Sequence, residues 1–428
     1  MKTLILDDDP TGTQSASGVD VLLEWDADLI EQALGGADAV YLLTNTRAVP
    51  EDEAVALLER TREQAGALLE RTREQAAEAG RRLGERIHIV LRGDSTLRGH
   101  VFPETAVFTG DRSVIVFVPA FPEGGRTTID GTHYVRIGDE TLPAHETEYA
   151  QDPVFPFRSG HLPDYVREQS GRETAHFGLA GLRDGAAEFR AALRDAAPGT
   201  VLLPDAETGD DVRIIAQAIT VAWADGADVV VRSASPLAAA IAGVESDGLL
   251  PSPLVAEPVA ALLVCGSHTI GATRQLAPVE AAFGPAEIVP TSDALQDAAA
   301  TGRAVAETAR ARLAATRFAA ISSERERDAS HNTLDHGERV MIALTSATAA
   351  LRGSVEVVVS KGGITSAEVA RVGLGARRAR VLGQVLPGVS VWSVVTPEDE
   401  EKLYVVVPGN VGDPATLVDV LAALGRTA

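Results

Sequence analysis

Short apolar runs, each ending in a polar turn, recur along the first half of the chain. The run 4–6 leads into the turn 7–14, and the runs 39–43, 87–91 and 113–118 lead into polar turns of their own. Long segments with helical patterns separate several of these runs. Strands that alternate with helices form parallel sheets, and ligands bind where the strands end. The pattern therefore predicts an α/β domain whose polar turns gather at one edge of its sheet.

The second half of the chain repeats this arrangement with turns that are rich in glycine. Its apolar runs, 261–265, 355–359 and 404–407, are each followed by a turn of small polar residues before a helix. Between the halves lies a stretch with three prolines and no periodicity, which is typical of a linker. We predict two α/β domains with largely parallel sheets and an active-site cleft between the domains. The expected boundaries are 1–245 for the N-terminal domain, 246–258 for the linker and 259–428 for the C-terminal domain.

One internal repeat interrupts the first half. Residues 56–65 and 67–76 have the same sequence, ALLERTREQA. Their offset of eleven residues is close to three helical turns, so the apolar stripe of a helix stays in phase. We interpret the repeat as a tandem duplication that lengthens a helix, in preference to a binding arm. Residues 143–171, which contain several prolines, are predicted to be rich in loops.

Composition and charge narrow the class of protein. The chain has 428 residues, of which 45% are hydrophobic and 23% charged, as in a soluble globular protein of two domains. We find no apolar run of 18 residues for a membrane span, and the apolar start of the chain is too short for a signal peptide. The single cysteine, Cys265, excludes an internal disulfide and a thiolate metal cluster, so we expect a cytoplasmic protein. The net charge of −23 disfavours nucleic acid as a partner.

The turn after the run 355–359 has the features of a phosphate-binding loop. Gly362 and Gly363 let backbone N–H groups approach an anion, and the helix that follows adds the positive end of its dipole. Lys361 precedes the glycines, so the spacing is not that of a P-loop. A Gly-Gly turn alone is more often structural. Because glycine turns also follow the other two strands of this half, we expect all three turns to converge on one phosphate chain.

The polar turns of the first half carry carboxylates, arginines and hydroxyl groups. Arginine binds a carboxylate through two hydrogen bonds, and aspartate accepts hydrogen bonds from sugar hydroxyls and can take a proton from one. The mixture suits a small, polyhydroxylated, anionic substrate. Two alternatives stay open for the run 7–9: a Mg²⁺ site, at which at most two of three consecutive aspartates can face one ion, and a solvated acidic turn.

Other candidate sites have weaker patterns. His331, Asp335 and His336 lack the spacing and the third ligand of a zinc site, and no metal-ligating residues are predicted. Cys265 lies inside an apolar run and is expected to be an inert core residue. The turn 7–14 lacks the Gly-x-Gly-x-x-Gly pattern, which disfavours a dehydrogenase.

Seven sequence blocks can be compared with known families: DDDPTGTQ (7–14), RGDSTLRGH (92–100), EGGRTTIDGTHYV (123–135), CGSHTIGATRQL (265–276), SKGGITSAEVA (360–370), LGQVLPGVSVW (382–392) and PGNVGD (408–413). Together, in this order, they resemble the four-carbon acid sugar kinase family. The resemblance covers nearly the whole chain. It implies an N-terminal sugar-acid domain and a C-terminal nucleotide domain. It also implies that the terminal hydroxyl of threonate, erythronate or 3-oxo-tetronate is phosphorylated by ATP, which we expect Mg²⁺ to help hold.

The resemblance also implies site residues. Those expected to contact the substrate are Asp8, Arg92, Asp94, Ser95 and Arg126. Those expected to line the nucleotide are Ser267, Gly362, Gly363, Ile364, Thr365, Gly409 and Gly412, to which the loop pattern adds Lys361 and Asn410. Our hypothesis is that Arg92 clamps the substrate carboxylate while Asp8 or Asp94 deprotonates the attacking hydroxyl.

Two alternative functions remain open from the sequence. One is a kinase for a different acid sugar, either branched or longer. The other is a non-catalytic effector or binding protein that reuses the fold. The expected partners are a small sugar acid and ATP, with neither nucleic acid nor membrane, and a homodimer is a candidate assembly.

Overall fold

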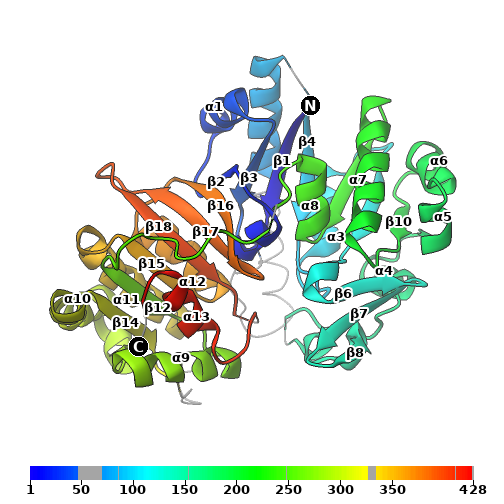
Figure 1. Ribbon diagram of the computed structural model, residues 1–428. Coiled ribbons are helices and arrows are strands. Elements are labelled where there is room, and N and C mark those ends of the chain that lie inside the picture. Colours follow the sequence, from blue (N-terminus) through cyan, green and yellow to red (C-terminus); the bar gives the residue numbers. More distant parts are fainter. Residues whose placement is uncertain are drawn as a thin grey trace. The chain divides into compact units, whose positions relative to one another are not determined.

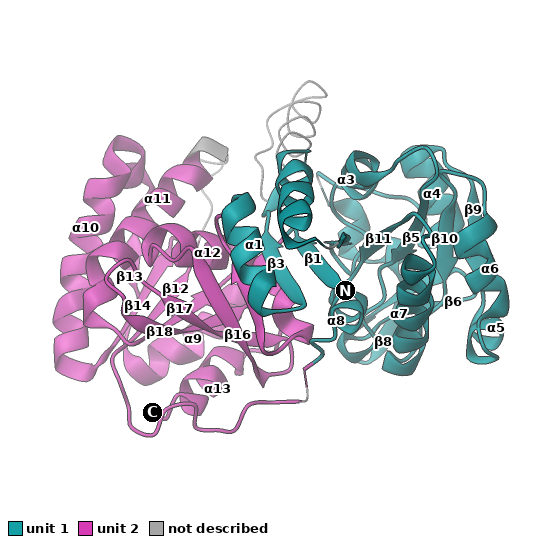
Figure 2. Ribbon diagram, turned by 90° about the horizontal axis from the view of Figure 1, so that it is seen from above, with its two compact units in different colours: residues 1–8, 25–245 teal, residues 9–24, 246–428 magenta. Residues whose placement is uncertain are grey.

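The computed structural model describes residues 1–46, 70–84, 86–152, 154–246, 248–325, 334–409 and 411–426. The chain forms two compact units (Figure 2). Unit 1 consists of residues 1–8 and 25–245, and unit 2 of residues 9–24 and 246–428. The first copy of the repeat, His331 and Asn410 lie outside the described residues, whereas 70–83 is helical. Over the described ranges, no helix is both long and apolar enough to cross a membrane.

Unit 1 contains a parallel sheet of seven strands in the order β3-β1-β4-β11-β5-β10-β9. Figure 1 labels β1, β3, β4 and β10 of this sheet. The strands come from the apolar runs, because residues buried on both faces of a parallel sheet need continuous apolar sequence. Every residue of β3, β5 and β11 is buried. The strands are β1 (Lys2–Asp7), β3 (Ala39–Leu43), β4 (Ile87–Arg92), β5 (Val114–Val118), β9 (Thr174–Phe177), β10 (Val201–Pro204) and β11 (Val229–Ser233).

Helices connect these strands, as the alternating pattern predicts. The N-terminus of α7 has a capping box, in which the Thr208 hydroxyl accepts from the backbone N–H of Asp211 and the Asp211 carboxylate accepts from that of Thr208. The region predicted to be rich in loops, 143–171, also contains the helix α4. The helices are α1 (Ala27–Gly36), α3 (Val101–Phe108), α4 (Leu162–Ser170), α5 (Leu179–Arg183), α6 (Ala187–Asp195), α7 (Gly209–Ala224) and α8 (Ser235–Ala242). A small antiparallel sheet contains β6 (Arg126–Ile129), β7 (Thr132–Ile137) and β8 (Glu140–Pro143).

Unit 2 has a mixed sheet in the order β13-β14-β12-β15-β18-β17-β16-β2. The first five strands are parallel, and the last three extend the sheet antiparallel. Along β16, exposed arginines alternate with buried alanine and valine, so one face of this extension is polar. The strands are β2 (Val19–Leu22), β12 (Ala261–Cys265), β13 (Glu287–Val289), β14 (Phe318–Ser323), β15 (Val357–Lys361), β16 (Arg378–Leu386), β17 (Val389–Val395) and β18 (Glu401–Val407).

An apolar cluster formed by β12, β14, β15, β17 and β18 together with flanking helices makes the core of unit 2. The helix α9 begins at an N-cap, Thr269, whose hydroxyl accepts from the backbone N–H of Ala272. The helices are α9 (Ile270–Phe283), α10 (Thr291–Thr316), α11 (Leu334–Leu351), α12 (Gly363–Glu368) and α13 (Thr416–Ala423). The structure thus confirms the fold class, two α/β units with largely parallel sheets, while the predicted cleft between them stays a prediction.

The structure corrects the predicted boundary within the first 25 residues. Residues 9–24 belong to unit 2, because β2 pairs antiparallel with β16 and the short 3-10 helix η1 (Pro10–Ser15) packs against α12. Thr13 contacts Trp392 there, with the indole N–H donating to the hydroxyl at 3.0 Å. These partners are more than 350 positions apart in the chain, so no local pattern could reveal them.

The predicted linker, 246–258, also packs on unit 2. The backbone N–H of Leu250 donates to the carbonyl of Gln384 at 2.7 Å, and that of Leu254 donates to Ala423 at 2.7 Å. Absence of periodicity therefore indicated an irregular segment correctly, but the segment is held by long-range backbone hydrogen bonds.

Candidate substrate and nucleotide sites

The carboxyl ends of β1, β4 and β11 bring buried charged side chains together in unit 1. Asp7 is in register with Arg92 of β4, and Arg92 with Ser233 of β11. Parallel neighbours that end together place their following residues at one edge of the sheet. The buried charged residues at this edge, called the charged edge below, are Asp7, Asp8, Arg92, Glu104 and Arg232.

Within the charged edge, carboxylates and guanidinium groups alternate. Arg92 donates through Nη1 to Asp7 Oδ1 at 3.0 Å and to Asp8 Oδ1 at 3.4 Å. Arg232 donates through Nη2 to Asp8 Oδ2 at 3.4 Å and through Nη1 to Glu104. Burial raises the pKa of Glu104, and the charge of Arg232 opposes that rise. Asp8 therefore has one guanidinium group at each carboxylate oxygen.

This arrangement bears on the role predicted for Arg92. Its guanidinium is buried and already faces Asp7 and Asp8. The clamp by Arg92 stays a prediction. Arg126, at the start of β6, is half-buried and donates to the carbonyl of Gly124.

The loop after β4 carries Asp94 and Ser95 and is fixed by contacts from other elements. His133 of β7 hydrogen-bonds through Nε2 to the Ser95 carbonyl at 2.8 Å, and the Tyr165 hydroxyl of α4 donates to the Leu97 carbonyl at 2.9 Å. Burial lowers the pKa of His133 to about 4, so the ring is neutral near pH 7 and Nε2 carries its proton. These two contacts hold a stretch in which Leu97 adopts a positive φ of 67°.

Asp94 is the more accessible of the two predicted catalytic acids. Its side chain is 8% exposed, against 2% for Asp8. Thr96 donates to the Asp94 carboxylate through its hydroxyl, and Arg98 does so through Nε at 2.9 Å. These two hydrogen bonds fix the orientation of the Asp94 carboxylate.

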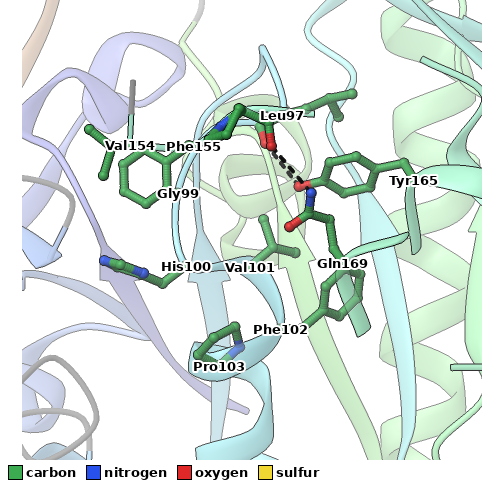
Figure 3. A pocket seen from close by; sticks show the side chains of 11 residues that line it. Leu97, Gly99, His100, Val101, Phe102, Pro103, Val154, Phe155, Tyr165 and Gln169 are labelled. Carbon is green, nitrogen blue, oxygen red and sulfur yellow. Dashed lines mark hydrogen bonds between the residues drawn. The ribbon is translucent and has the colours of Figure 1, made fainter. Parts of the chain in front are cut away.

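A pocket of about 250 Å³ adjoins the charged edge (Figure 3). Figure 3 shows Phe155 and Tyr165 on opposite sides of the space, with the Tyr165 hydroxyl turned toward Leu97. Gly99 belongs to both regions, since a Cβ on it would lie 3.4 Å from Asp8 Oδ2. None of the lining residues is Asp, Glu, Lys or Arg. They are Leu97, Gly99, His100, Val101, Phe102, Pro103, Val154, Phe155, Pro156, Tyr165 and Gln169.

In unit 2, three glycine-containing turns meet at the carboxyl ends of β12, β15 and β18. Cys265 is in register with Lys361, and Lys361 with Val407. The turns touch closely: a Cβ on Gly362 would lie 3.0 Å from the Ser267 Cβ, and one on Gly409 would lie 3.5 Å from the Ser267 hydroxyl. The structure therefore brings the three predicted turns together in one unit.

Backbone atoms and small side chains line these turns. Gly362 has a φ of 112°, which favours glycine. The Thr269 hydroxyl donates to the Gly409 carbonyl at 3.4 Å, which ties the first turn to the third. Gly412 has a φ of 88° and packs on Thr416. Ile364 is 48% exposed beside the glycines, while Thr365 is buried against Gly266.

Lys361 has a different position from the one its sequence suggests. Its side chain is fully buried and donates through Nζ to the carbonyl of Pro408 at 2.6 Å and to that of Val411 at 3.4 Å. Burial lowers the pKa of Lys361 to about 8. The contacts indicate that Lys361 holds the third turn in place. Direct contact with a phosphate stays a prediction.

The buried charge of Lys361 makes the stability of unit 2 depend on pH. The pKa of an unperturbed lysine is about 10.4. Between pH 8 and 10 the unfolded chain keeps a proton that the native protein has released, so the free energy of unfolding is expected to rise with pH in this window. Below pH 8 both states are charged and the native state retains the unfavourable burial.

Urea unfolding at pH 7.5, 8.5 and 9.5 checks this prediction, with Lys361→Met as the comparison. The wild type should gain stability relative to Lys361→Met as the pH rises. Parallel changes in the two proteins would show that Lys361 does not titrate in this range.

The sequence did not reveal the roles of Arg232 and Glu104, and it did not separate Asp9 from the two aspartates that precede it. Arg232 is the penultimate residue of an apolar strand, in register with Leu91, one position before Arg92 in the neighbouring β4, and an arginine near the carboxyl end of both strands was a usable signal. Glu104 lies in the helix α3 and gave no signal. Asp9 belongs to unit 2, where a Cβ on Gly363 would lie 3.0 Å from its Cγ. The three consecutive aspartates therefore serve two different units.

Comparison with known proteins assigns the family. A family model described as a sugar-binding N-terminal domain matches residues 3–241, and one described as a nucleotide-binding C-terminal domain matches residues 262–417. The chain belongs to the four-carbon acid sugar kinase family. The motifs of the sequence predicted this membership.

Three similar proteins are named as kinases of erythronate, threonate or 3-oxo-tetronate. The chain is 30% identical over 253 residues to a D-erythronate kinase of Heliobacterium modesticaldum, a match that covers 58% of this chain and 51% of that protein. It is 30% identical to a D-threonate kinase of Bordetella bronchiseptica, with 68% and 65% covered. A 3-oxo-tetronate kinase of Methylobacterium radiotolerans is 27% identical, with 81% and 80% covered. The matches thus span about half to two thirds of the first two relatives.

Solved structures support the fold. A Salmonella typhimurium LT2 protein superimposes with a TM-score of 0.67 at 19% identity, covering 98% of both chains. A Haemophilus influenzae protein from a family of unknown function superimposes with a TM-score of 0.63 at 17% identity, covering 99% of this chain and 100% of the other. At such identities the likeness concerns the fold alone.

Proposed function

We propose that the protein is an ATP-dependent kinase for the terminal hydroxyl of a four-carbon acid sugar of the threonate, erythronate or 3-oxo-tetronate class. One observation carries the proposal: each unit has the site that its matching family model describes. The unit that matches the sugar-binding model has Asp94 on a loop fixed by hydrogen bonds at the charged edge. The unit that matches the nucleotide-binding model brings three glycine turns together. The names of the relatives support the same substrate class.

The reaction asks the protein for positioning and for charge neutralisation. The terminal hydroxyl oxygen forms a bond to the γ-phosphorus, the bond from that phosphorus to the β–γ bridging oxygen breaks, and ADP leaves. We assign acceptance of the hydroxyl proton to Asp94, because it is the more exposed acid and Arg98 and Thr96 fix its carboxylate. Arg126, half-buried at the start of β6, is assigned to the carboxylate of the substrate.

In unit 2 the glycine turns are assigned to the phosphates of ATP. Backbone and hydroxyl groups at these turns come from Ser267, Gly362, Gly363 and Gly409. The buried side chain of Lys361 donates a hydrogen bond to the third turn and holds it in place. Among the described residues, no group of three His, Cys, Asp or Glu side chains could hold a metal. Mg²⁺ needs only one or two carboxylates besides phosphates and water. Asp9, beside Gly363, fits such a role, and the ion would neutralise charge on the phosphates.

One structural feature favours the alternative of a branched or longer acid sugar. The pocket next to Gly99 contains none of Asp, Glu, Lys and Arg, and apart from His100, Gln169 and the Tyr165 hydroxyl its lining side chains are apolar, so it suits an uncharged carbon substituent rather than a carboxylate. The alternative of a non-catalytic effector finds no such support. A homodimer and a cytoplasmic location remain predictions.

A coupled assay of ADP release tests the proposed function. The panel contains threonate, erythronate and 3-oxo-tetronate, an acid with a methyl branch, and a five-carbon acid. We expect turnover with at least one four-carbon acid and none without an acid. Preference for the branched acid would favour the alternative substrate, and binding of ATP without turnover on any acid would favour the effector.

A further inference from the structure

Arg232 is a buried arginine of unit 1 for which the mechanism above has no use. It is the penultimate residue of β11, is 1% exposed and is among the largest fully buried side chains of the described residues. Taking a guanidinium group out of water is strongly unfavourable unless it is paired and hydrogen-bonded. Its position therefore needs an explanation beyond packing.

The guanidinium of Arg232 lies against both ends of the loop that carries Asp94. A Cβ on Gly93 would lie 2.6 Å or less from three guanidinium atoms, and one on Gly99 would lie 3.2 Å from Nη2. The backbone N–H of Gly93 also donates to the carbonyl of Ser233, the next residue of β11, at 2.8 Å. Gly93 has no left-handed φ, so the close approach of Arg232 explains why this position is glycine.

Carboxylates on two other elements fix the guanidinium. Arg232 donates to Asp8, after β1, and to Glu104 of α3. The second oxygen of Glu104 accepts from the Thr46 hydroxyl at 2.8 Å. Elements far apart in the sequence thus hold one planar group in a single orientation beneath residues 93–99.

We propose that Arg232 is a positioning residue that sets the place of the loop 93–99, and through it the place of the Asp94 carboxylate. The inference rests on the proposed function, in which Asp94 accepts the proton of the hydroxyl. In this role Arg232 acts through the loop and not through a contact of its own with the substrates.

Arg232→Lys and Arg232→Met test this role. A displacement of about 1 Å in a catalytic group lowers the rate about a hundredfold. We expect kcat for the sugar acid to fall about a hundredfold in Arg232→Met, while KM for ATP stays within twofold. Arg232→Lys should recover part of the loss, because the charge toward Asp8 and Glu104 is kept while the planar fork is lost. The matched control is Arg183→Lys, which alters an exposed arginine of the same unit that pairs with the buried carboxylate of Asp211.

A double-mutant cycle approaches the same contact from the loop. A methyl group at position 93 collides with the guanidinium, so Gly93→Ala should lower kcat about tenfold in the wild type. In the Arg232→Met background it should have less than a twofold effect, because the shorter side chain leaves room. Gly181→Ala is the control, since a Cβ there meets nothing within 4 Å. If the fold-changes in kcat of the two single substitutions multiply to give that of the double variant, the two sites are independent and the inference is overturned.

The outcomes separate this inference from the proposed function. If the wild type transfers phosphate and Asp94→Asn does not, but folded Arg232→Lys and Gly93→Ala keep kcat within twofold, the inference fails and the function stands. If the wild type phosphorylates none of the acids, both fail. Thermal unfolding of each variant shows whether the variant is folded. A loss of activity that is explained entirely by unfolding would also count against a positioning role. If Arg232→Met does not fold, the kcat values of Arg232→Lys and Gly93→Ala test the inference in its place.

Discussion

Asparagine in place of Asp94 is expected to lower kcat for phosphoryl transfer about 10²- to 10⁴-fold, the range of a lost general base. The amide keeps an oxygen that can accept from Arg98 and Thr96, so the loop stays in place and only proton acceptance is lost. The free energy of unfolding should change by less than about 1 kcal/mol, because the partners at this site remain satisfied. Steady-state kinetics with the preferred acid and urea unfolding measure the two quantities.

Asp8→Asn is expected to behave differently. Its carboxylate faces Arg92 on one oxygen and Arg232 on the other, and removal of one charge from a buried ion pair costs about 3–5 kcal/mol. Stability and kcat should therefore fall together. Asp228→Asn serves as the control. Asp228 directly precedes β11, at the opposite end of the sheet, and accepts a hydrogen bond from the Ser113 hydroxyl. Normal turnover in Asp94→Asn, with lost turnover in a stable Asp8→Asn, would move the base to Asp8.

Alanine at Gly363 is expected to weaken ATP binding about tenfold to a hundredfold. The added Cβ would lie 3.0 Å from Asp9 Cγ and 3.1 Å from Oδ1, and the carboxylate is fixed because Oδ1 accepts from the backbone N–H of Thr11 at 2.8 Å. Inserting a methyl group into a packed contact costs about 1–3 kcal/mol. Gly363 does not have a left-handed φ, so the effect comes from this contact and not from backbone strain.

Titration calorimetry with ATP measures this effect, and Gly353→Ala is the control because a Cβ at Gly353 meets nothing within 4 Å. KM for the sugar acid should change little, since Gly363 belongs to unit 2. An unchanged dissociation constant for ATP in folded Gly363→Ala would remove this turn from the nucleotide site.

Most strands of the unit 1 sheet and their parallel direction could be predicted from the sequence, because they depend on local pattern. Runs such as 39–43 and 113–118 are continuously apolar, and a strand buried on both faces requires that. The polar residues at the ends of these runs must share an edge once the strands are parallel. Asp8, Arg92 and Asp94 were accordingly placed at one edge from sequence, and their individual roles stay predictions.

Charge partners could not be predicted in the same way. Arg92 was predicted to bind the substrate carboxylate from the residue types of the polar turns and the family resemblance, and Lys361 was predicted to bind phosphate because it precedes two glycines. In the fold, Arg92 meets Asp7 and Asp8, and Lys361 meets two backbone carbonyls. Burial of a charge and the identity of its partner depend on residues far apart in the chain.

The sequence alone determined the alternation of strands and helices, the two units with their polar and glycine-rich turns, and membership of the family, because periodicity and short motifs are local properties. Tertiary structure alone decided that residues 9–24 join unit 2, that Arg232 lies beneath Gly93 and Gly99, and that Glu104 pairs with it. Strand pairing and ion pairing between distant segments depend on which surfaces are buried against each other in the folded chain. No single stretch of sequence specifies these pairings.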